Sequence, residues 1–325
     1  MTESVEFAQM FNQFFKNSSR MASTYKPIFL RSLLDIGALA DPGQKEKLVG
    51  KDWLKIKDGK IFVNLNFIAI RFAKYYWDME YSFRLRQSQD RQDANITRIV
   101  RSAHDSHKKP PTIRELSGDD MEFFRKQVIT KSLKPEVLVH LQTDMAELYK
   151  KTDSNTISLD ADIIDFFHTY KTTITYGLNY VTAKYLEKIN NNVPNITRKV
   201  EHDPTKQTRK ALPSEIQLKM KNWQESKCLY CKNEFESHHV DHVIPFNFVF
   251  STEPFNCVLA CQQCNCTKSD MLPDKSLFAD VLDRNNEIES FLDEQKTTYD
   301  EDKYKILFDT CVAEYNGNKF FKPEI

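Results

Sequence analysis

Of the six cysteines between positions 227 and 273, four bracket a short set of acidic, basic and amide side chains. These four form two Cys-x-x-Cys pairs, Cys228/Cys231 and Cys261/Cys264. Each pair places two sulfurs on one tight turn, and four thiolates arranged in this way are typical of a tetrahedral zinc site. The spacing therefore predicts that all four residues bind one structural Zn²⁺ ion, because so small a segment has little core of its own.

The residues between and after the two pairs have the chemistry of a phosphodiesterase. Asp241 and His242 are adjacent, and Asn256 and Asn265 follow them. A carboxylate and an amide offer hard oxygen ligands to a divalent ion such as Mg²⁺ or Mn²⁺, and a neutral imidazole can take a proton from water. The order predicts a one-metal hydrolytic site. A zinc module without activity, serving as an adaptor for nucleic acid or protein, is the alternative.

In order and spacing this segment resembles the HNH nuclease family, whose fold is the ββα-metal finger. The resemblance implies that His242 is the general base, that Asp241 and Asn265 hold the catalytic metal, and that Asn256 fixes the loop carrying the base. Asn265 ends the motif, as in the HNH domains of RNA-guided CRISPR nucleases. Cys266 departs from relatives that carry Arg or another polar residue there, so no phosphate contact is expected from it. The residues that carry the resemblance are Asp241, His242, Val243, Ile244, Pro245, Asn256, Cys261, Cys264, Asn265 and Lys268.

The chain has a net charge of +0, so any nucleic-acid contact requires local concentrations of positive charge. One basic stretch leads into the first cysteine pair, and we expect substrate contacts from Arg209 and Lys210 in it, together with His239 and Lys268. An earlier basic stretch is interrupted by Asp and Gln, so it is either a solvated helix face or a second phosphate contact. The two stretches are Arg198, Lys199, Lys206, Arg209, Lys210, Lys219, Lys221 and Lys227, and Arg84, Arg86, Arg91, Arg98, Arg101, Lys108 and Lys109.

Composition favours an intracellular enzyme of two domains. The 325 residues are 40% hydrophobic and 12% aromatic, enough for a sizeable core. No apolar run reaches the ~18 residues of a membrane span, and the first residues lack the basic-then-apolar pattern of a signal peptide. We therefore expect a cytoplasmic protein without membrane contact. The chain has seven cysteines, which fits a reducing compartment, and three remain as free thiols: Cys257, Cys266 and Cys311.

The predicted fold is mainly α with a small α+β module: a helical N-terminal domain plus a C-terminal, zinc-stapled ββα-metal HNH nuclease domain. We expect the helical domain over 1–195, for recognition or partner docking, a basic linker and helix over 196–226, the HNH module over 227–275, and closing helices over 276–325. Asp58-Gly59 between apolar runs predicts a hairpin. The start of the chain is then either winged-helix-like or an ordinary helical domain with one hairpin.

Local signals in the first domain give further expectations. Ser23-Thr24 is expected to cap a helix that runs from Ile28 to Ile36 and ends at Gly37. Pro110-Pro111 separates two helical blocks, and a long helix is predicted over 163–189. Its aromatic residues are expected to pack in the core rather than to stack on bases; they are Tyr176, Tyr180 and Tyr185.

Short matches along the whole chain, such as Tyr25-Lys26-Pro27 and Leu85-Arg86-Gln87-Ser88, are similar to HNH endonucleases of bacterial restriction and defence loci. This resemblance implies a bacterial or archaeal cytoplasm and a DNA endonuclease that acts as an anti-phage effector. We expect a homodimer or a subunit of a defence complex, because one finger contacts only a few phosphates of one strand. The alternative is an RNase or toxin that uses the same site, since the finger contacts phosphates and does not exclude RNA.

Overall fold

The computed structural model describes residues 3–17, 21–41, 43, 53–89, 93–105, 118–145, 147–202, 209–294, 297–317 and 319–323. These residues divide into two compact units, Met1–Asn190 and Asn191–Ile325, which are described separately below. Several residues that the sequence singled out lie outside the described ones, namely Arg91, Lys108, Lys109, Pro110, Pro111 and Lys206.

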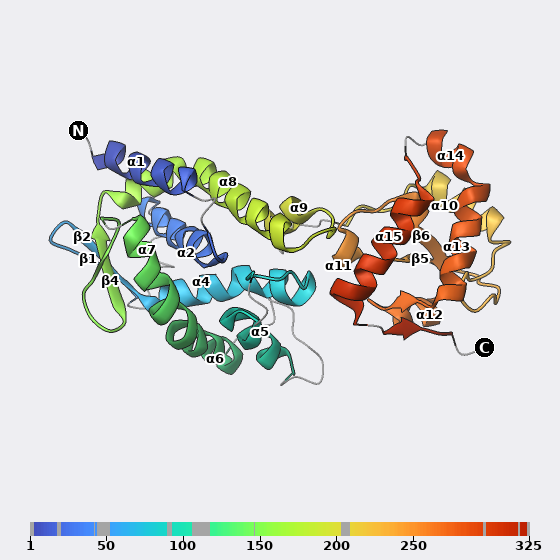
Figure 1. The fold of residues 1–325 in the computed structure, drawn as a ribbon, viewed down its shortest axis with the longest axis horizontal. Helices are drawn as coiled ribbons and strands as arrows, with labels where there is room; N and C mark the ends of the chain where they lie inside the picture. Colours follow the sequence, from blue (N-terminus) through green and yellow to red (C-terminus); the bar gives the residue numbers. More distant parts are fainter. Residues whose placement is uncertain are drawn as a thin grey trace. The chain divides into compact units, whose positions relative to one another are not determined.

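The first unit is built from helices, with one small antiparallel sheet at one end of them (Figure 1). The sheet has the strand order β1-β2-β4-β3. The predicted hairpin is present: Lys57 pairs with Lys60, and Asp58 and Gly59 both have positive φ, as a tight two-residue turn requires. The elements are α1 (Glu3–Lys16), α2 (Tyr25–Leu33), a 3₁₀ helix (Leu34–Ala40), β1 (Leu54–Lys57), β2 (Lys60–Asn64), α4 (Leu65–Trp77), a π-helical turn (Asp78–Ser82), α5 (Asn95–Asp105), α6 (Gly118–Val128), a π-helical segment (Ile129–Val137), α7 (Leu138–Asp144), β3 (Lys150–Lys151), β4 (Thr156–Asp160) and α8 (Ile163–Ile189).

The core of this unit forms where α4 and α8 pack against α2 and the 3₁₀ helix. Leu65, Ile68 and Phe72 recur on one face of α4 and are fully buried. Gly37 lies inside the 3₁₀ helix, where an added Cβ would stand 2.7 Å from the backbone nitrogen of His168 on α8. The expectation that Gly37 ends a helix was therefore wrong, because this glycine instead permits two helices to approach closely.

Two other local expectations hold only in part. The Ser23 hydroxyl accepts from the backbone amide of Tyr25, the first residue of α2, at 3.4 Å. Thr24 precedes α2 but makes no side-chain cap, because its hydroxyl bonds to Gln87 and Tyr76 in the core. Tyr185 is buried as expected, whereas Tyr176 and Tyr180 are 64% and 63% exposed. Both lie on the solvent face of α8, so the prediction of packing holds for only one of the three tyrosines.

The second unit places a two-stranded antiparallel sheet, β5-β6, among short helices (Figure 1). Its elements are α9 (Ile196–Val200), α10 (Ser214–Trp223), β5 (His239–His242), α11 (Phe246–Val249), a 3₁₀ turn (Pro254–Asn256), β6 (Cys257–Ala260), α12 (Gln262–Lys268), β7 (Leu272–Pro273), α13 (Lys275–Glu287), α14 (Glu289–Glu294), α15 (Glu301–Cys311), a π-helical turn (Val312–Asn316) and β8 (Phe320–Phe321). The predicted fold class is confirmed: the described chain is mostly helical with a small sheet module.

The closing helices complete the core of the second unit. α13 and α15 contribute Val281, Tyr304 and Phe308 to one buried cluster with Val243, Ile244 and other residues around the β5-β6 pair. The aromatic rings of Phe278 and Phe308 stack at 3.9 Å between centroids. The segment that carries the candidate chemistry is therefore held inside a larger helical body. In the described parts of the chain, no helix combines the length and the apolar character needed to cross a membrane.

Candidate active site and zinc cluster

The β5-β6 pair and α12 bring the candidate residues together. Asp241 and His242 end β5, and His242 pairs with Cys257 at the start of β6. β6 leads through Cys261 into α12, which carries Asn265. Val243 and Ile244 follow β5, and Pro245 then precedes α11, so the strand does not continue beyond this short connection. Residues separated by more than twenty positions thus share one end of a small sheet.

The four cysteines predicted to bind zinc form one cluster. Their Sγ atoms all lie within 4.8 Å of one another, and the Sγ atoms of Cys231 and Cys261 are 3.9 Å apart. Tetrahedral coordination at Zn–S distances of about 2.3 Å places sulfurs about 3.8 Å apart, so the spacing fits a zinc ion. The amide of Cys264 also donates to Sγ of Cys261 at 3.4 Å, as in a tight knuckle. The cluster could therefore hold a metal such as zinc.

Asp241 is a nearly buried carboxylate with a buried cation beside it. The Tyr230 hydroxyl donates to Oδ2 of Asp241 at 2.5 Å, and Nζ of Lys268 lies 2.9 Å from the same oxygen. Burial and the adjacent Asp241 raise the pKa of Tyr230 well above its usual value, so its hydroxyl keeps the proton that it donates. Among the described residues, Oδ1 of Asp241 has no hydrogen-bond partner. One oxygen is thus fixed, and the other is available to a ligand.

Lys268 has a different surrounding from the one expected for a phosphate contact. Its side chain is 0% exposed, and Nζ donates to the carbonyl oxygen of His242 at 2.7 Å in addition to its ion pair with Asp241. An ammonium group with both partners inside the protein cannot reach a substrate phosphate without leaving them. The expected substrate contact of Lys268 is therefore replaced by an internal one, which neutralises Asp241 and fixes the end of β5.

His242 is poised as a neutral base. Its Nε2 lies 3.3 Å from the Thr252 hydroxyl, and its ring meets the Phe246 ring edge-on at 5.3 Å between centroids. Burial lowers the pKa of His242 to about 4, and the positive charges of Arg209 and Lys268 act in the same direction. The imidazole therefore carries no charge at neutral pH and has a nitrogen lone pair for a proton.

Asn256 holds the loop that follows His242. Its side-chain amide bonds twice to Ile244: Nδ2 donates to the carbonyl oxygen, and Oδ1 accepts from the backbone amide, each at 2.9 Å. The Tyr304 hydroxyl of α15 donates to the same Oδ1 at 2.8 Å. Because all of these groups are buried, each bond replaces a lost contact with water and the loop has little freedom to move.

A cavity of about 230 Å³ opens at this end of the sheet. It brings together four of the predicted site residues: Asp241, His242, Asn265 and Arg209. The Arg209 guanidinium lies 4.6 Å from the centre of the Phe246 ring, at the rim of the same cavity. The full lining is Arg209, Val240, Asp241, His242, Pro245, Phe246, Asn265, Ser269 and Asp270.

Besides Lys268, two further residues expected to bind substrate do not line this cavity. His239 is exposed at the first position of β5, and Lys210 is exposed in the segment before α10. Within the other basic positions, Lys199 is 2% exposed and donates to the carbonyl oxygen of Phe248 at 2.5 Å. Burial lowers the pKa of Lys199 to about 7, so this residue belongs to the interior rather than to a phosphate-binding face.

Several residues of the site carry no recognisable signal in the sequence. Tyr230 sits inside the first cysteine pair as a spacer residue, and Thr252 and Asp270 lie in polar loops. Arg284, on α13, is buried and donates to the carbonyl oxygens of Cys257 and Phe255, at 2.6 and 3.0 Å. Those two residues flank Asn256, so a helix distant in the sequence fixes the backbone on both sides of Asn256.

Comparison with known proteins was made for the whole chain. The family model described as HNH endonuclease matches residues 228–271. The match supports the resemblance of this segment to the HNH family that the sequence indicated. Searches of curated proteins and of solved structures gave no match. The HNH match contains both cysteine pairs and the cavity residues from Asp241 to Asp270, which suggests a nuclease that binds divalent metal and acts on nucleic acid.

Proposed function

We propose that the chain is a metal-dependent endonuclease that hydrolyses phosphodiester bonds in DNA with the HNH segment. The observation that carries the proposal is that Asp241, His242 and Asn265 line one cavity, while the four cysteines form a separate cluster. A structural site uses all of its ligands on the metal, whereas a catalytic site keeps positions open for water and substrate. The four cysteines have the character of a structural site, and the cavity residues have the character of a catalytic site.

Each side chain has a role in this proposal. Neutral His242 accepts a proton from a water molecule as that water attacks phosphorus, and the bond from phosphorus to the 3′ oxygen breaks. The products are a 5′-phosphate and a 3′-hydroxyl end. Asp241 and Asn265 would hold Mg²⁺ or Mn²⁺, which supplies positive charge for the phosphate oxygens and the leaving group. Asn256 positions the loop, and Arg209 attracts phosphate to the rim.

The substrate, setting and assembly are finer parts of the same proposal. The resemblance of short segments to nucleases of restriction and defence loci is the reason for proposing DNA as substrate, a role as an anti-phage or restriction effector, and a location in the cytoplasm. One metal and one base act on one strand, so duplex cleavage calls for a homodimer or a partner in a defence complex. Light scattering at micromolar concentration tests the dimer. A monomer that linearises plasmid DNA in one step, without any partner, would contradict it.

The deciding experiment compares purified wild-type protein and His242→Ala on plasmid DNA and on structured RNA, with Mg²⁺, Mn²⁺ or chelator. Removal of the general base should lower the rate by about 10²- to 10⁴-fold and leave the zinc content unchanged. His168→Ala, an exposed histidine on α8, is the matched control and should retain full activity.

The outcomes separate the alternatives. DNA nicking that needs a divalent ion and yields ends that a ligase can join supports the proposal. Cleavage of RNA alone would establish the RNase or toxin instead. Products with 3′-phosphate ends would contradict the mechanism, and a protein that contains zinc but cleaves neither substrate would be an adaptor module.

A further inference from the structure

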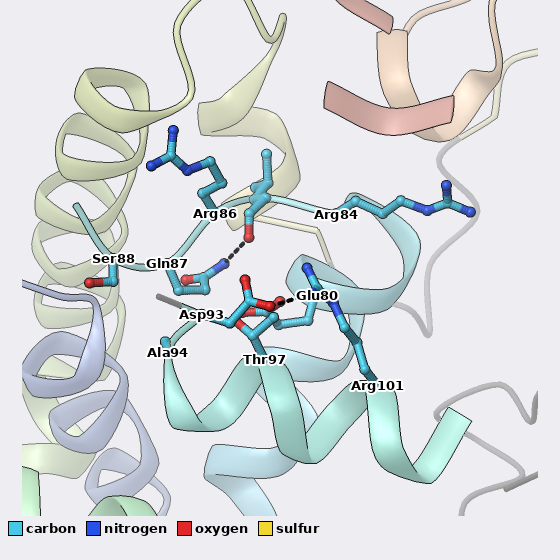
Figure 2. A pocket seen from close by; sticks show the side chains of 10 residues that line it. Glu80, Arg84, Arg86, Gln87, Ser88, Asp93, Ala94, Thr97 and Arg101 are labelled. Carbon is cyan, nitrogen blue, oxygen red and sulfur yellow. Dashed lines mark hydrogen bonds and ion pairs between the residues drawn. The ribbon is translucent and has the colours of Figure 1, made fainter. Parts of the chain in front are cut away.

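A second polar cavity lies wholly within the first unit, far along the chain from the HNH match. Its volume is about 270 Å³, and we call it the arginine pocket. The loop 84–88 forms one wall, and the first turns of α5 form the other (Figure 2). Its lining residues are Glu80, Arg84, Leu85, Arg86, Gln87, Ser88, Asp93, Ala94, Thr97 and Arg101.

The charges of the arginine pocket favour an anion. Its lining includes three arginines, Arg84, Arg86 and Arg101, and the carboxylate Asp93, with which Arg101 forms an ion pair. Glu80 adds no negative charge at neutral pH, because burial raises its pKa to about 8 despite the Thr97 hydroxyl that donates to it and the nearby Arg101. The pocket therefore has a net positive charge while the whole chain has none.

Buried polar side chains hold the wall of the pocket in place. Asn190, at the end of α8, accepts from the backbone amide of Arg86 at 2.7 Å and donates to its carbonyl oxygen at 3.0 Å. Gln87 is 1% exposed; it donates to the carbonyl oxygen of Leu85 and accepts from the Thr24 hydroxyl at 2.8 Å. The backbone around Arg84 and Arg86 is thus fixed before any ligand binds, which lowers the entropic cost of binding.

Arg84 has an unusual backbone conformation for its residue type. Its φ is +51°, in the left-handed region that glycine and asparagine adopt more readily. This conformation is strained for a residue with a Cβ atom and is found preferentially at functional sites. In Figure 2, Arg84 and Arg86 leave the loop in different directions and Arg101 rises from α5, while Glu80, Asp93 and Thr97 lie between the loop and α5.

The spread of the arginines indicates what kind of anion fits. Guanidinium groups that converge on one point suit a single small ion, whereas groups that point apart suit a ligand with successive negative charges. A nucleic-acid strand presents such charges at intervals along its backbone. We propose that the arginine pocket binds the phosphate backbone of a nucleic-acid strand, as a second contact in addition to the HNH cavity. The choice of nucleic acid as the ligand rests on the proposed nuclease function.

The test measures binding separately from cleavage. All proteins carry His242→Ala and no divalent ion is added, so the probes stay intact. The probes are a fluorescein-labelled single-stranded DNA with a 5′-phosphate, the same DNA without it, and a nucleoside monophosphate as competitor. The variant combines Arg84→Asn, chosen because asparagine tolerates the left-handed conformation, with Arg86→Gln. Lys55→Gln on β1, an exposed cation outside the arginine pocket, is the matched control.

We expect the double variant to bind both DNA probes about tenfold more weakly. The slope of log affinity against log salt concentration should also become shallower, by the equivalent of about one to two phosphate contacts. Lys55→Gln should change neither quantity. Loss of affinity for the 5′-phosphorylated DNA alone would overturn the backbone contact in favour of a terminal phosphate. If the nucleoside monophosphate competes with DNA for the parent protein but not for the double variant, the pocket binds a nucleotide and the proposal is overturned.

Unchanged affinity and salt dependence in the double variant, or no binding of any probe to the parent protein, would also overturn the proposal. These outcomes are independent of the nuclease test, because cleavage by the wild-type protein is measured separately. Circular dichroism of the variant checks that the loop substitutions leave the fold intact.

Discussion

The two units each bury a carboxyl group beside a polar cavity, and they treat it in opposite ways. In the second unit, the Lys268 ammonium compensates the charge of Asp241, and the Tyr230 hydroxyl bonds to the same oxygen. In the first unit, the hydroxyl of Thr97 is the hydrogen-bond donor to Glu80, and burial raises the pKa of Glu80 to about 8. One carboxyl group has its charge paired, and the other is protonated instead.

This difference follows from the cost of moving charge out of water. An isolated ion in the protein interior loses several kcal/mol of solvation, so it must acquire a partner or become neutral. A charge-paired carboxylate with one free oxygen suits a metal site. A protonated carboxylic acid among arginines suits an anion site, because it adds no negative charge beside them. The two cavities are thus prepared for ligands of opposite sign.

The largest expected effect concerns the cysteine cluster. There a bound dication would compensate the negative charge of the thiolates, as a third way to stabilise buried charge. Cys228→Ser should abolish zinc binding and unfold the HNH segment, because structural zinc contributes on the order of 10 kcal/mol in small zinc modules. Calorimetry should lose the transition of the second unit and keep that of the first.

Cys266→Ser is the matched control for this prediction. Cys266 lies on the same helix as Cys264 but is exposed and outside the cluster, so zinc content and both transitions should stay as in the wild type. Elemental analysis that finds no zinc in a folded wild-type protein would contradict the assignment of the cluster.

The parts of the structure that the sequence predicted well are those with local signals. The cysteine spacing predicted the cluster, Asp58-Gly59 predicted the hairpin, and the adjacent Asp241 and His242 were found in one cavity. Each of these depends on residues within one turn, or on a motif with a fixed order. Helix periodicity also predicted the mainly helical class.

The parts that the sequence could not predict depend on long-range contacts. Nothing local distinguishes a lysine that contacts phosphate from one that is buried, so the internal ion pair of Lys268 was missed. Gly37 has the signature of a helix end, but its role comes from the approach of α8, far along the chain. Arg284 is an ordinary helix residue until its two carbonyl partners are known.

The next effect tests the paired carboxylate directly. Lys268→Met removes the ammonium, keeps much of the side-chain volume, and leaves Asp241 buried without a cation. Breaking a buried ion pair in this way should lower the free energy of unfolding of the second unit by about 3–5 kcal/mol. Urea denaturation followed by circular dichroism measures it. Adding Asp241→Asn should restore most of the loss, because no charge is then left unpaired.

A loss below about 1 kcal/mol in Lys268→Met would show that Asp241 does not depend on its partner, and the contrast with Glu80 would fail. The double variant is needed because Lys268 also donates to the carbonyl oxygen of His242. Loss of that bond alone should cost about 1 kcal/mol and should remain in the double variant.

The smallest effect concerns the neutral carboxyl group and depends on pH. The pKa of Glu80 is about 8 in the folded protein and near its ordinary value of 4.5 in the unfolded chain. Between these values the folded state alone holds the proton, so stability falls as pH rises through this window and levels off above it. Glu80→Gln removes the titration and preserves a similar shape.

The wild-type protein should therefore lose about 2 kcal/mol relative to Glu80→Gln between pH 6 and pH 8, since each pH unit contributes about 1.4 kcal/mol for one proton. Urea titrations of the first unit at both pH values measure the difference. Glu122→Gln on α6 is the control: Lys126 and Arg125 lower the pKa of Glu122, so it is already ionised throughout this range. If the difference between wild type and Glu80→Gln is the same at both pH values, Glu80 is ionised in the folded protein. The arginine pocket would then lack the excess positive charge on which its anion binding depends.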